Sequence, residues 1–359
     1  MKQIINGQPQ AIRMAIIGYG GMGGWHHSSV KERVPEVEVT GACDVREEAR
    51  EKARSQGLYA YETLQELLDD PAIELVTVAV PNNFHKPLVI ACLEAGKNVI
   101  CEKPVALNAA EMEEMMAAAK RCGKVFSVHQ NRRWDKDYQI VKKAVADGMI
   151  GTPYFFESRV QGSRGAVYGW RGHKENGGGM VLDWCAHLVD QMLMMIDSPV
   201  ISVYAHLMEL FSEVDDNVQV MLRFENGIMA RLEVLTNCFI NQSRWHVSGS
   251  GGTLQINDWD CSGKIVKARE GTELEWTNDI VYTEAGPTRT MAPRPKIMTE
   301  EVDLPDVSTD WSDYYRNIAK VIRGEEELLV KPEQVLRNMR VIDAIFESQE
   351  QKKSITVRI

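Results

Sequence analysis

The sequence predicts an α/β protein with a doubly wound parallel sheet, followed by an α+β domain with a large, mainly antiparallel open sheet. In the first part of the chain, short apolar runs rich in β-formers alternate with amphipathic helical segments. This alternation is typical of βαβ units. In the second part, segments of alternating polarity turn at Asn-Gly or at glycines, as antiparallel hairpins do. We therefore expect two domains, residues 1–131 and 132–359.

The elements of the first domain follow from these runs in order. The predicted strands cover residues 13–18, 37–44, 73–80, 98–102 and 124–131. The predicted helices cover residues 45–56, 85–96 and 109–123. Because the carboxyl ends of parallel strands meet at one edge of an open sheet, a ligand site is expected there.

The second domain is predicted from four segments. Residues 217–236 alternate apolar and polar side chains on both sides of Asn226-Gly227, and residues 244–258 form a second predicted hairpin. Residues 176–196 are predicted to be a helix entered through three glycines. Residues 332–351 form an amphipathic helix, for which packing back on the first domain is possible.

Composition limits the classes of function. The chain has 359 residues, a net charge of −10 and a pI near 5.4, so neither nucleic acid nor an anionic membrane is expected as a partner. No apolar run approaches the roughly 20 residues that span a bilayer, and no signal peptide is visible. The seven cysteines form no CxxC pair, so we expect reduced thiols, no metal site and a cytoplasmic location.

A glycine-rich turn predicts dinucleotide binding. Gly18, Gly20 and Gly23 follow the first strand as GxGxxG, a spacing that permits a tight turn, close approach of a pyrophosphate, and close packing of helix on strand. Asp44 ends the second strand and is expected to bind the ribose 2′-hydroxyl, which favours NAD over NADP. Arg46 either accepts a 2′-phosphate or is a solvated residue at a helix start. The predicted phosphate loop consists of Gly18, Tyr19, Gly20, Gly21, Met22 and Gly23.

The other strand ends supply further candidates. Lys103 ends a buried strand, and we expect its ammonium group to point into the cleft over the nicotinamide and to stabilise a developing alkoxide. Pro104 restricts the backbone directly after it. For the segment PNNFH, helix capping is the alternative to cofactor contact. The candidates for cofactor contact at these strand ends are Pro81, Asn82, His85, Glu102, Lys103 and Asn131.

The predicted helix 176–196 is apolar almost all round but carries a narrow polar stripe. Asp183 and His187 stand four residues apart and are expected to share a face. One interpretation is a core histidine with an acidic partner. The other is a general base, His187, that titrates near neutrality beside a carboxylate that orients the substrate or the imidazole.

A glycine-rich loop at residues 162–179 carries aromatic and cationic side chains that suit a polyhydroxylated ligand, although a lid or a subunit contact would use the same residue types. The candidates for substrate contact, besides Lys103, Asp183 and His187, are Arg132, Trp134, Arg164, Tyr168, Trp170 and Arg171.

Taken together, the motifs resemble the glucose–fructose oxidoreductase / inositol dehydrogenase / rhizopine-catabolism (Gfo/Idh/MocA) family. The matching segments are GYGGMG at 18–23, Asp44, PNNFH at 81–85, EKP at 102–104, NRRWD at 131–135 and GGGMVLDWCAH at 177–187. The resemblance implies an N-terminal Rossmann domain and a C-terminal α/β domain whose open sheet forms homodimers or homotetramers. It also implies an active-site lysine, aspartate and histidine at Lys103, Asp183 and His187. The first dozen residues precede the expected start and have no assigned role.

The expected function is transfer of a hydride between NAD and a secondary alcohol of a sugar, glycoside or cyclitol, with oxidation at C3 of a pyranoside as one possibility. His187 would take the hydroxyl proton, Lys103 would polarise the oxygen, and Asp183 would position the substrate and the imidazole. Two alternatives stay open: an NAD-dependent glycosidase that acts by transient oxidation and elimination, and a non-catalytic regulator that senses a dinucleotide.

Overall fold

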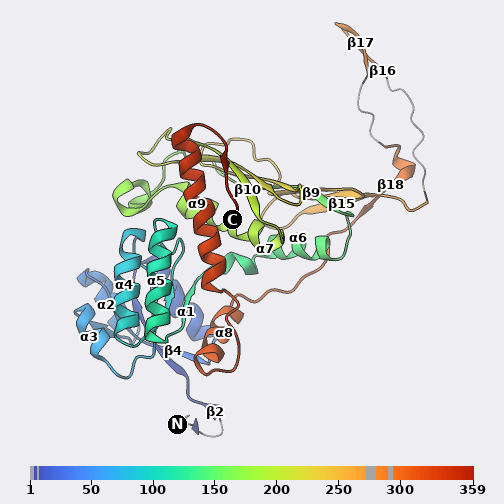
Figure 1. Cartoon of the computed structure of the whole chain (residues 1–359). Coiled ribbons are helices and arrows are strands. Elements are labelled where there is room, and N and C mark those ends of the chain that lie inside the picture. Colours follow the sequence, from blue (N-terminus) through green and yellow to red (C-terminus); the bar gives the residue numbers. More distant parts are fainter. Residues whose placement is uncertain (1–3, 6–7, 272–279, 290–293) are drawn as a thin grey trace.

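The computed structural model describes residues 4–5, 8–271, 280–289 and 294–359. Two large sheets, each covered by helices, form the body of the molecule (Figure 1). The first is wholly parallel and the second is mainly antiparallel, which confirms the predicted fold class.

The parallel sheet has six strands in the order β5-β4-β3-β6-β7-β8. The strands are β3 (Ile12–Ile17), β4 (Val37–Cys43), β5 (Tyr59–Tyr61), β6 (Leu75–Val78), β7 (Asn98–Cys101) and β8 (Phe126–Val128). The helices are α1 (Gly21–Arg33), α2 (Glu47–Ser55), α3 (Leu64–Asp69), α4 (His85–Glu94) and α5 (Ala109–Cys122). The strand order reverses between β3 and β6, and ligands of open α/β sheets bind outside such a reversal.

The second sheet has nine strands in the order β18-β15-β14-β13-β9-β12-β11-β10-β19. The strands are β9 (Pro153–Gln161), β10 (Val200–Met208), β11 (Asn217–Phe224), β12 (Met229–Leu235), β13 (Trp245–Gly249), β14 (Gly252–Ile256), β15 (Gly263–Ala268), β18 (Thr299–Val302) and β19 (Ile355–Thr356). Both predicted hairpins are present, as β11–β12 and β13–β14. Strands β9 and β12 run parallel.

Helices join the two sheets into one body. The second sheet is accompanied by α6 (Lys136–Ala146) and α7 (Ala186–Met195). The long helix α9 (Pro332–Gln351) contacts α7 and β10 on one side and α5 of the first domain on the other. Helix α8 (Asp313–Ile322) lies beside β4 (Figure 1). A separate hairpin, β16 (Ile280–Thr283) and β17 (Gly286–Arg289), projects from the body (Figure 1).

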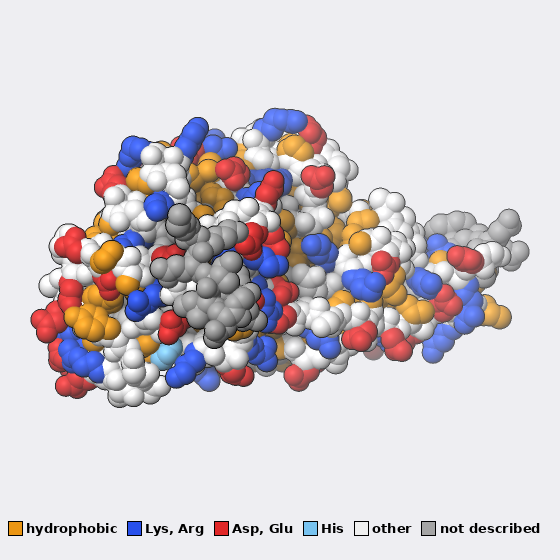
Figure 2. Space-filling view, turned by 90° about the horizontal axis from the view of Figure 1, so that it is seen from below, with side chains coloured by type: hydrophobic (Ala, Val, Ile, Leu, Met, Phe, Trp, Pro, Cys, Tyr) orange, Lys and Arg blue, Asp and Glu red, His pale blue; other side chains and the backbone are white. Residues whose placement is uncertain are grey.

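The remaining short elements lie mostly at loops. They are β1 (Ile4–Ile5), β2 (Gln8–Pro9) and the short helices η1 (Asn82–Phe84), η2 (Asn131–Trp134), η3 (Gly169–Gly172), η4 (Lys174–Asn176) and η6 (Lys296–Met298). Acidic and basic side chains intermix on the face shown in Figure 2. Within the described ranges, no helix combines the length and the apolar character that crossing a bilayer requires.

The predicted helix 176–196 begins later than expected. Gly177 and Gly179 have positive φ angles of 69° and 106°, which end the loop rather than start a helix. A π-helical turn, η5 (Val181–Cys185), follows, and α7 continues from it. Isolated π turns occur frequently at functional sites.

Candidate functional site

A cavity of about 940 Å³ lies at the carboxyl ends of the parallel strands. It reaches across the β3/β6 reversal, where an α/β sheet is expected to hold a ligand. The predicted residues that line it are Gly18, Gly20, Gly21, Met22, Asp44, Arg46, Pro81, Asn82, Glu102, Lys103, Trp170 and Arg171. Residues from both domains therefore share one cavity.

The glycines of the turn allow the backbone to pack closely at Gly18 and Gly23 and leave open space at Gly21. Gly18 has a φ of +89°, and a Cβ there would lie 2.3 Å from the carbonyl oxygen of Ala79. A Cβ on Gly23 would lie 2.0 Å from the carbonyl oxygen of Gly18, so α1 packs directly on the turn. Gly21 has open space around its Cβ position. The start of α1 thus presents backbone N–H groups at the cavity, which fits a dinucleotide pyrophosphate.

Asp44 stands at the end of β4 with its carboxylate engaged on both oxygens. Its Oδ2 accepts the N–H of Tyr19 at 2.8 Å, while the guanidinium of Arg46 lies 3.1 Å from Oδ1 and 3.2 Å from Oδ2. Burial favours a higher pKa for Asp44, but the hydrogen bonds from Arg46 and Tyr19 hold it below the ordinary value. An ionised carboxylate therefore lines the cavity beside the exposed guanidinium of Arg46.

Sequence reasoning missed part of the cavity wall. Glu62, Thr63 and Leu64, at the start of α3, line the cavity near Asp44. The only sequence signal was Thr63, which caps α3 by accepting the N–H of Glu66. That pattern predicts a helix start but not its place against a ligand.

Lys103 lines the cavity and joins the two domains by bonding Asp183, whereas neither Asp183 nor His187 is among the residues that line it. Lys103 Nζ lies 2.9 Å from Asp183 Oδ1 and 2.9 Å from its carbonyl oxygen. Arg171 Nε donates to the same Oδ1 at 3.1 Å. Burial alone would raise the pKa of Asp183, yet the charges of Lys103 and Arg171 lower it. An ionised carboxylate is therefore held between two cations.

His187 lies on α7, one turn beyond Asp183, and only 3% of its surface is exposed. Its Nδ1 is buried and has no hydrogen-bond partner among the residues that the structure describes. Burial, followed by the charges of Lys103 and Arg132, holds the pKa of His187 well below its ordinary value. The expectation of titration near neutrality is therefore wrong. The imidazole is neutral at pH 7, which is the form that accepts a proton.

The expected contact between Asp183 and His187 is replaced by other contacts. Among the described residues, the hydrogen bonds of Asp183 go to Lys103 and Arg171 and none goes to the imidazole. Asp183 lies in the π turn and His187 on the α-helix that follows it, so the shared face stays a prediction from the four-residue spacing.

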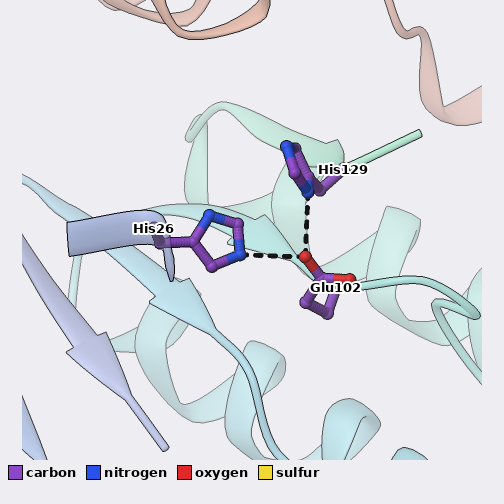
Figure 3. A group of neighbouring side chains, drawn as sticks. All are labelled: His26, Glu102 and His129. Carbon is purple, nitrogen blue, oxygen red and sulfur yellow. Dashed lines mark hydrogen bonds and ion pairs between the residues drawn. The ribbon is translucent and has the colours of Figure 1, made fainter. Parts of the chain in front are cut away.

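His26, Glu102 and His129 form a buried cluster, in which both imidazoles point to the carboxylate (Figure 3). His26 Nε2 and His129 Nδ1 each lie 2.8 Å from Glu102 Oε1, and the backbone N–H of Lys103 donates to Oε2 at 3.1 Å. Tyr315 of α8 bonds the other ring nitrogen of His26. Burial opposes ionisation, but the two histidines hold the pKa of Glu102 well below its usual range.

This cluster has the residue types of a metal site, and its ligand atoms lie within 4.8 Å of one another, but the two imidazole nitrogens lie closer to Glu102 Oε1 than two ligands of one ion would. Two ligands on one tetrahedral zinc ion, each bonded at about 2.0–2.1 Å, would stand roughly 3.3 Å apart. The 2.8 Å separations in the cluster are hydrogen-bond distances. Glu102 therefore fixes the strand end that carries Lys103 through main-chain and imidazole contacts.

Two of the predicted cofactor contacts point elsewhere. His85 is fully buried, and its ring nitrogens lie 2.8 Å from the carbonyl oxygen of Pro104 and 2.9 Å from that of Val80, so it braces two strand ends from behind. The phenol of Tyr19 is buried against His27 Nδ1 at 2.7 Å. Tyr19 contributes its backbone to the turn, but its side chain turns away.

Of the loop and junction residues predicted to contact substrate, some line the cavity and others lie away from it. Trp134 packs into the core beside Tyr314. Tyr168 is 95% exposed, and Arg164 is also exposed on the loop surface. Asn131 begins η2, and it is absent from the cavity lining. Short-range sequence reasoning could not separate these loop residues from Trp170 and Arg171, which do line the cavity.

Arg132 lies on an aromatic wall beside His187. Its guanidinium stacks 4.1 Å from the ring centre of Trp184 and forms an ion pair with Asp135 at 2.9 Å. The ring of Trp184 is 6.0 Å from that of His187, and the ring of Trp259 is 5.8 Å from that of Trp184. Trp259 lies between β14 and β15, far from the motifs in sequence, and was not foreseen.

Comparison with known proteins agrees with this architecture. Residues 12–130 match the oxidoreductase family with an NAD-binding Rossmann fold (GFO_IDH_MocA), and residues 138–255 match the GFO/IDH/MocA C-terminal domain. The chain is 28% identical over 347 residues to scyllo-inositol 2-dehydrogenase (NADP(+)) IolW of Bacillus subtilis, covering 96% of this chain and 95% of that protein. It is 31% identical over 230 residues to myo-inositol 2-dehydrogenase of Thermotoga maritima, covering 62% and 68%.

A solved structure shows the same fold at higher identity. The crystal structure of an NAD-binding protein from Listeria innocua superposes with a TM-score of 0.91 at 41% identity, covering 97% of this chain and 100% of that one. With both domains matched in order and the cavity formed between them, the chain belongs to the Gfo/Idh/MocA oxidoreductase family.

Proposed function

We propose that the protein is an NAD-dependent dehydrogenase that moves a hydride between nicotinamide and a secondary alcohol of a cyclitol or sugar. The observation that carries this proposal is the 2.9 Å contact between Lys103 Nζ and Asp183 Oδ1. It places an ammonium group from the dinucleotide-binding domain against a carboxylate of the second domain. The neutral imidazole of His187 follows one turn later.

Each of the three side chains has a chemical role in alcohol oxidation. The nicotinamide, when bound, accepts the hydride from the carbinol carbon. His187, neutral and buried, takes the hydroxyl proton. Lys103 donates a hydrogen bond to the oxygen as it becomes an alkoxide and then a carbonyl. Asp183 holds the ammonium in place and offers its carboxylate to a neighbouring hydroxyl of the substrate.

The substrate class rests on the aromatic and polar wall and on the relatives. A cyclitol or pyranose has an apolar face that can stack on a tryptophan ring and several hydroxyls that need donors and acceptors. Trp170 and Arg171 line the cavity. Two relatives are described as inositol 2-dehydrogenases, of scyllo- and of myo-inositol. This makes the inositols the first compounds to test.

The proposed preference for NAD rests on Asp44. An ionised carboxylate at the end of β4 accepts ribose hydroxyls and repels a 2′-phosphate. Arg46 acts in the opposite sense, because its exposed guanidinium could leave Asp44 and bind that phosphate. The relative IolW is described as using NADP(+), so the comparison of the two coenzymes belongs to the test.

The test is a panel of inositols, hexoses and glycosides, with coenzyme reduction followed by absorbance for NAD and NADP separately. We expect reduction of NAD by at least one cyclitol or sugar, with a higher kcat/KM than for NADP. Coenzyme binding without any turnover on the panel would contradict the proposal. A chromogenic glycoside in the panel detects leaving-group release, which would instead indicate elimination chemistry.

We also propose that copies of the chain associate through the nine-stranded sheet. One face of this sheet carries exposed apolar side chains at Tyr204, Met229 and Val266, and Tyr154 is exposed at the start of β9. Such apolar surface favours contact with another chain. Sedimentation of the full chain, compared with a Tyr204→Lys variant, tests this: a monomeric wild type would contradict it.

A further inference from the structure

Asp215 lies at the start of the helix that carries Asp183 and His187. It belongs to the segment between β10 and β11, and only 8% of its surface is exposed. Its Oδ2 accepts the N–H of Val181 at 2.6 Å, and its carbonyl oxygen accepts the N–H of Met180 at 2.8 Å. Both N–H groups belong to the first turn, where a helix lacks internal partners.

The backbone around this contact leaves space for the carboxylate. Gly179 has a φ of +106°, and a Cβ there would lie 2.2 Å from Asp215 Oδ1. The carboxylate therefore occupies the position that a side chain at residue 179 would need. The π turn that bears Asp183 begins at Val181, the residue whose N–H the carboxylate accepts.

The carboxylate faces donors and has few charged neighbours. The N–H groups of Val181, Met180 and Asp215 itself all favour its ionised form. No described basic group forms an ion pair with it. On its own segment, Glu209 is the acidic group whose charge acts on it, and on the helix the buried thiol of Cys185 faces it. Burial is the dominant influence and raises the pKa of Asp215 to about 7.

We propose that Asp215 is a positioning residue, whose ionised carboxylate caps the π turn and thereby holds Asp183 and His187 in the geometry that hydride transfer requires. The catalytic part of this inference rests on the proposed function above. The capping of the π turn by Asp215 does not depend on the proposed function. Protonation puts an O–H beside the N–H donor of Val181 and weakens the cap, so the turn loosens and turnover falls.

The expected pH dependence has a definite sign. Turnover rises as pH increases through about 7, because the ionised carboxylate is the better acceptor. The pKa values of His187 and Asp183 both lie below their ordinary values, so neither produces a step near pH 7. Global stability changes in the opposite direction. Because the folded-state pKa of Asp215 is above that of the unfolded chain, its contribution is fully present below the unfolded pKa of about 3.9 and is lost as pH rises from there to the folded pKa of about 7.

The experiment compares the wild type with Asp215→Asn and with a matched control, Asp343→Asn. Asparagine keeps an acceptor oxygen but cannot titrate. Asp343 is also a carboxylate that accepts a helix-start N–H, that of Ala109 at 3.0 Å, and burial raises its pKa, but it caps α5, away from the catalytic turn. Amide hydrogen exchange of a peptide covering residues 176–185 is measured over pH, corrected for intrinsic rates, together with kcat for NAD reduction.

We expect wild-type protection of this peptide to fall about fivefold as pH drops through 7, the size of one lost cap. kcat should fall over the same range. Both steps should vanish in Asp215→Asn and remain in Asp343→Asn. A wild type without the exchange step, or Asp215→Asn with it, overturns the proposal, and the wild-type measurement decides even if the variant does not fold. If no polyol is oxidised, the proposed function fails while the exchange step still decides the role of Asp215.

Discussion

Replacing Lys103 with methionine tests the centre of the proposed mechanism. Methionine keeps a similar unbranched volume but removes the ammonium group that contacts Asp183 at 2.9 Å through both its carboxylate and its carbonyl oxygen. The lysine side chain is 14% exposed, so its charge acts where water is largely excluded. Removing one such donor from a developing oxyanion typically costs about 10²–10³-fold in kcat, or about 2.7–4 kcal/mol.

Lys103→Met also changes the pKa of Asp183, the partner of the lysine. Asp183 would keep only the hydrogen bond from Arg171 at 3.1 Å, so its pKa should rise toward the value that burial favours. Coenzyme affinity should change little, because the glycine turn and Asp44 lie at the other strand ends. We therefore expect a loss in kcat with an almost unchanged dissociation constant for NADH.

The assay pairs coenzyme reduction with the inositol that the panel identifies and fluorescence titration of NADH. The matched control is Lys86→Met, in which a half-buried ammonium group of α4 loses its ion pairs with Glu114 at 3.3 Å and Glu111 at 3.7 Å on α5. We expect Lys86→Met to keep wild-type kcat. A Lys103→Met enzyme with wild-type kcat would refute the assignment of the ammonium group, and equal losses in both variants would indicate a general effect on folding.

Three further predictions concern the cofactor domain. Gly23→Ala should destabilise the fold by about 1–3 kcal/mol and weaken NADH binding, because the new Cβ would lie 2.0 Å from a main-chain oxygen. The control is Gly24→Ala, whose Cβ would meet only the end of a lysine side chain at 3.6 Å. Thermal unfolding compares the two variants, and equal shifts in Tm would contradict the packing argument. Asp44→Ser should shift the ratio of kcat/KM for NADP to kcat/KM for NAD in favour of NADP by about tenfold or more. Adding Arg46→Ala should remove that gain. An unchanged ratio would contradict the proposal that Asp44 determines the choice of coenzyme. Glu102→Gln should lose about 1–3 kcal/mol at neutral pH, because one amide nitrogen replaces an acceptor among buried donors. Since the folded-state pKa of Glu102 is depressed, wild-type stability is full above its unfolded pKa of about 4.3 and declines as pH falls further, and this decline should be shallower in the variant when both are unfolded in urea.

Local patterns were sufficient to predict the architecture. Alternating polarity on both sides of Asn226-Gly227 predicted the β11–β12 pair, because side chains on a strand alternate between its faces. The spacing of Gly18, Gly20 and Gly23 predicted the tight turn, and the structure shows why a side chain does not fit at the first and third positions. Lys103 was placed correctly at the cavity, since the end of a parallel strand fixes which edge a residue reaches.

Side-chain directions at the site depended on contacts between distant segments. His85 and the phenol of Tyr19 belong to the right motifs, yet their polar atoms are satisfied behind the strand ends. Asp183 bonds Lys103 and Arg171, and no helical periodicity could have shown those partners. Trp259 came from a hairpin turn with no motif.

The sequence by itself determined which strands and helices form and which edge of the parallel sheet holds a ligand, because those outcomes depend on periodicity, on glycines and on strand direction. Only the tertiary structure decided that two histidines hold Glu102 and that Asp183 pairs with Lys103. It also decided that Asp215 caps the π turn that carries Asp183. Those contacts join residues 27, 80 and 34 positions apart. Their geometry, and with it the protonation state of each group, is set by burial and by neighbours that only folding brings together.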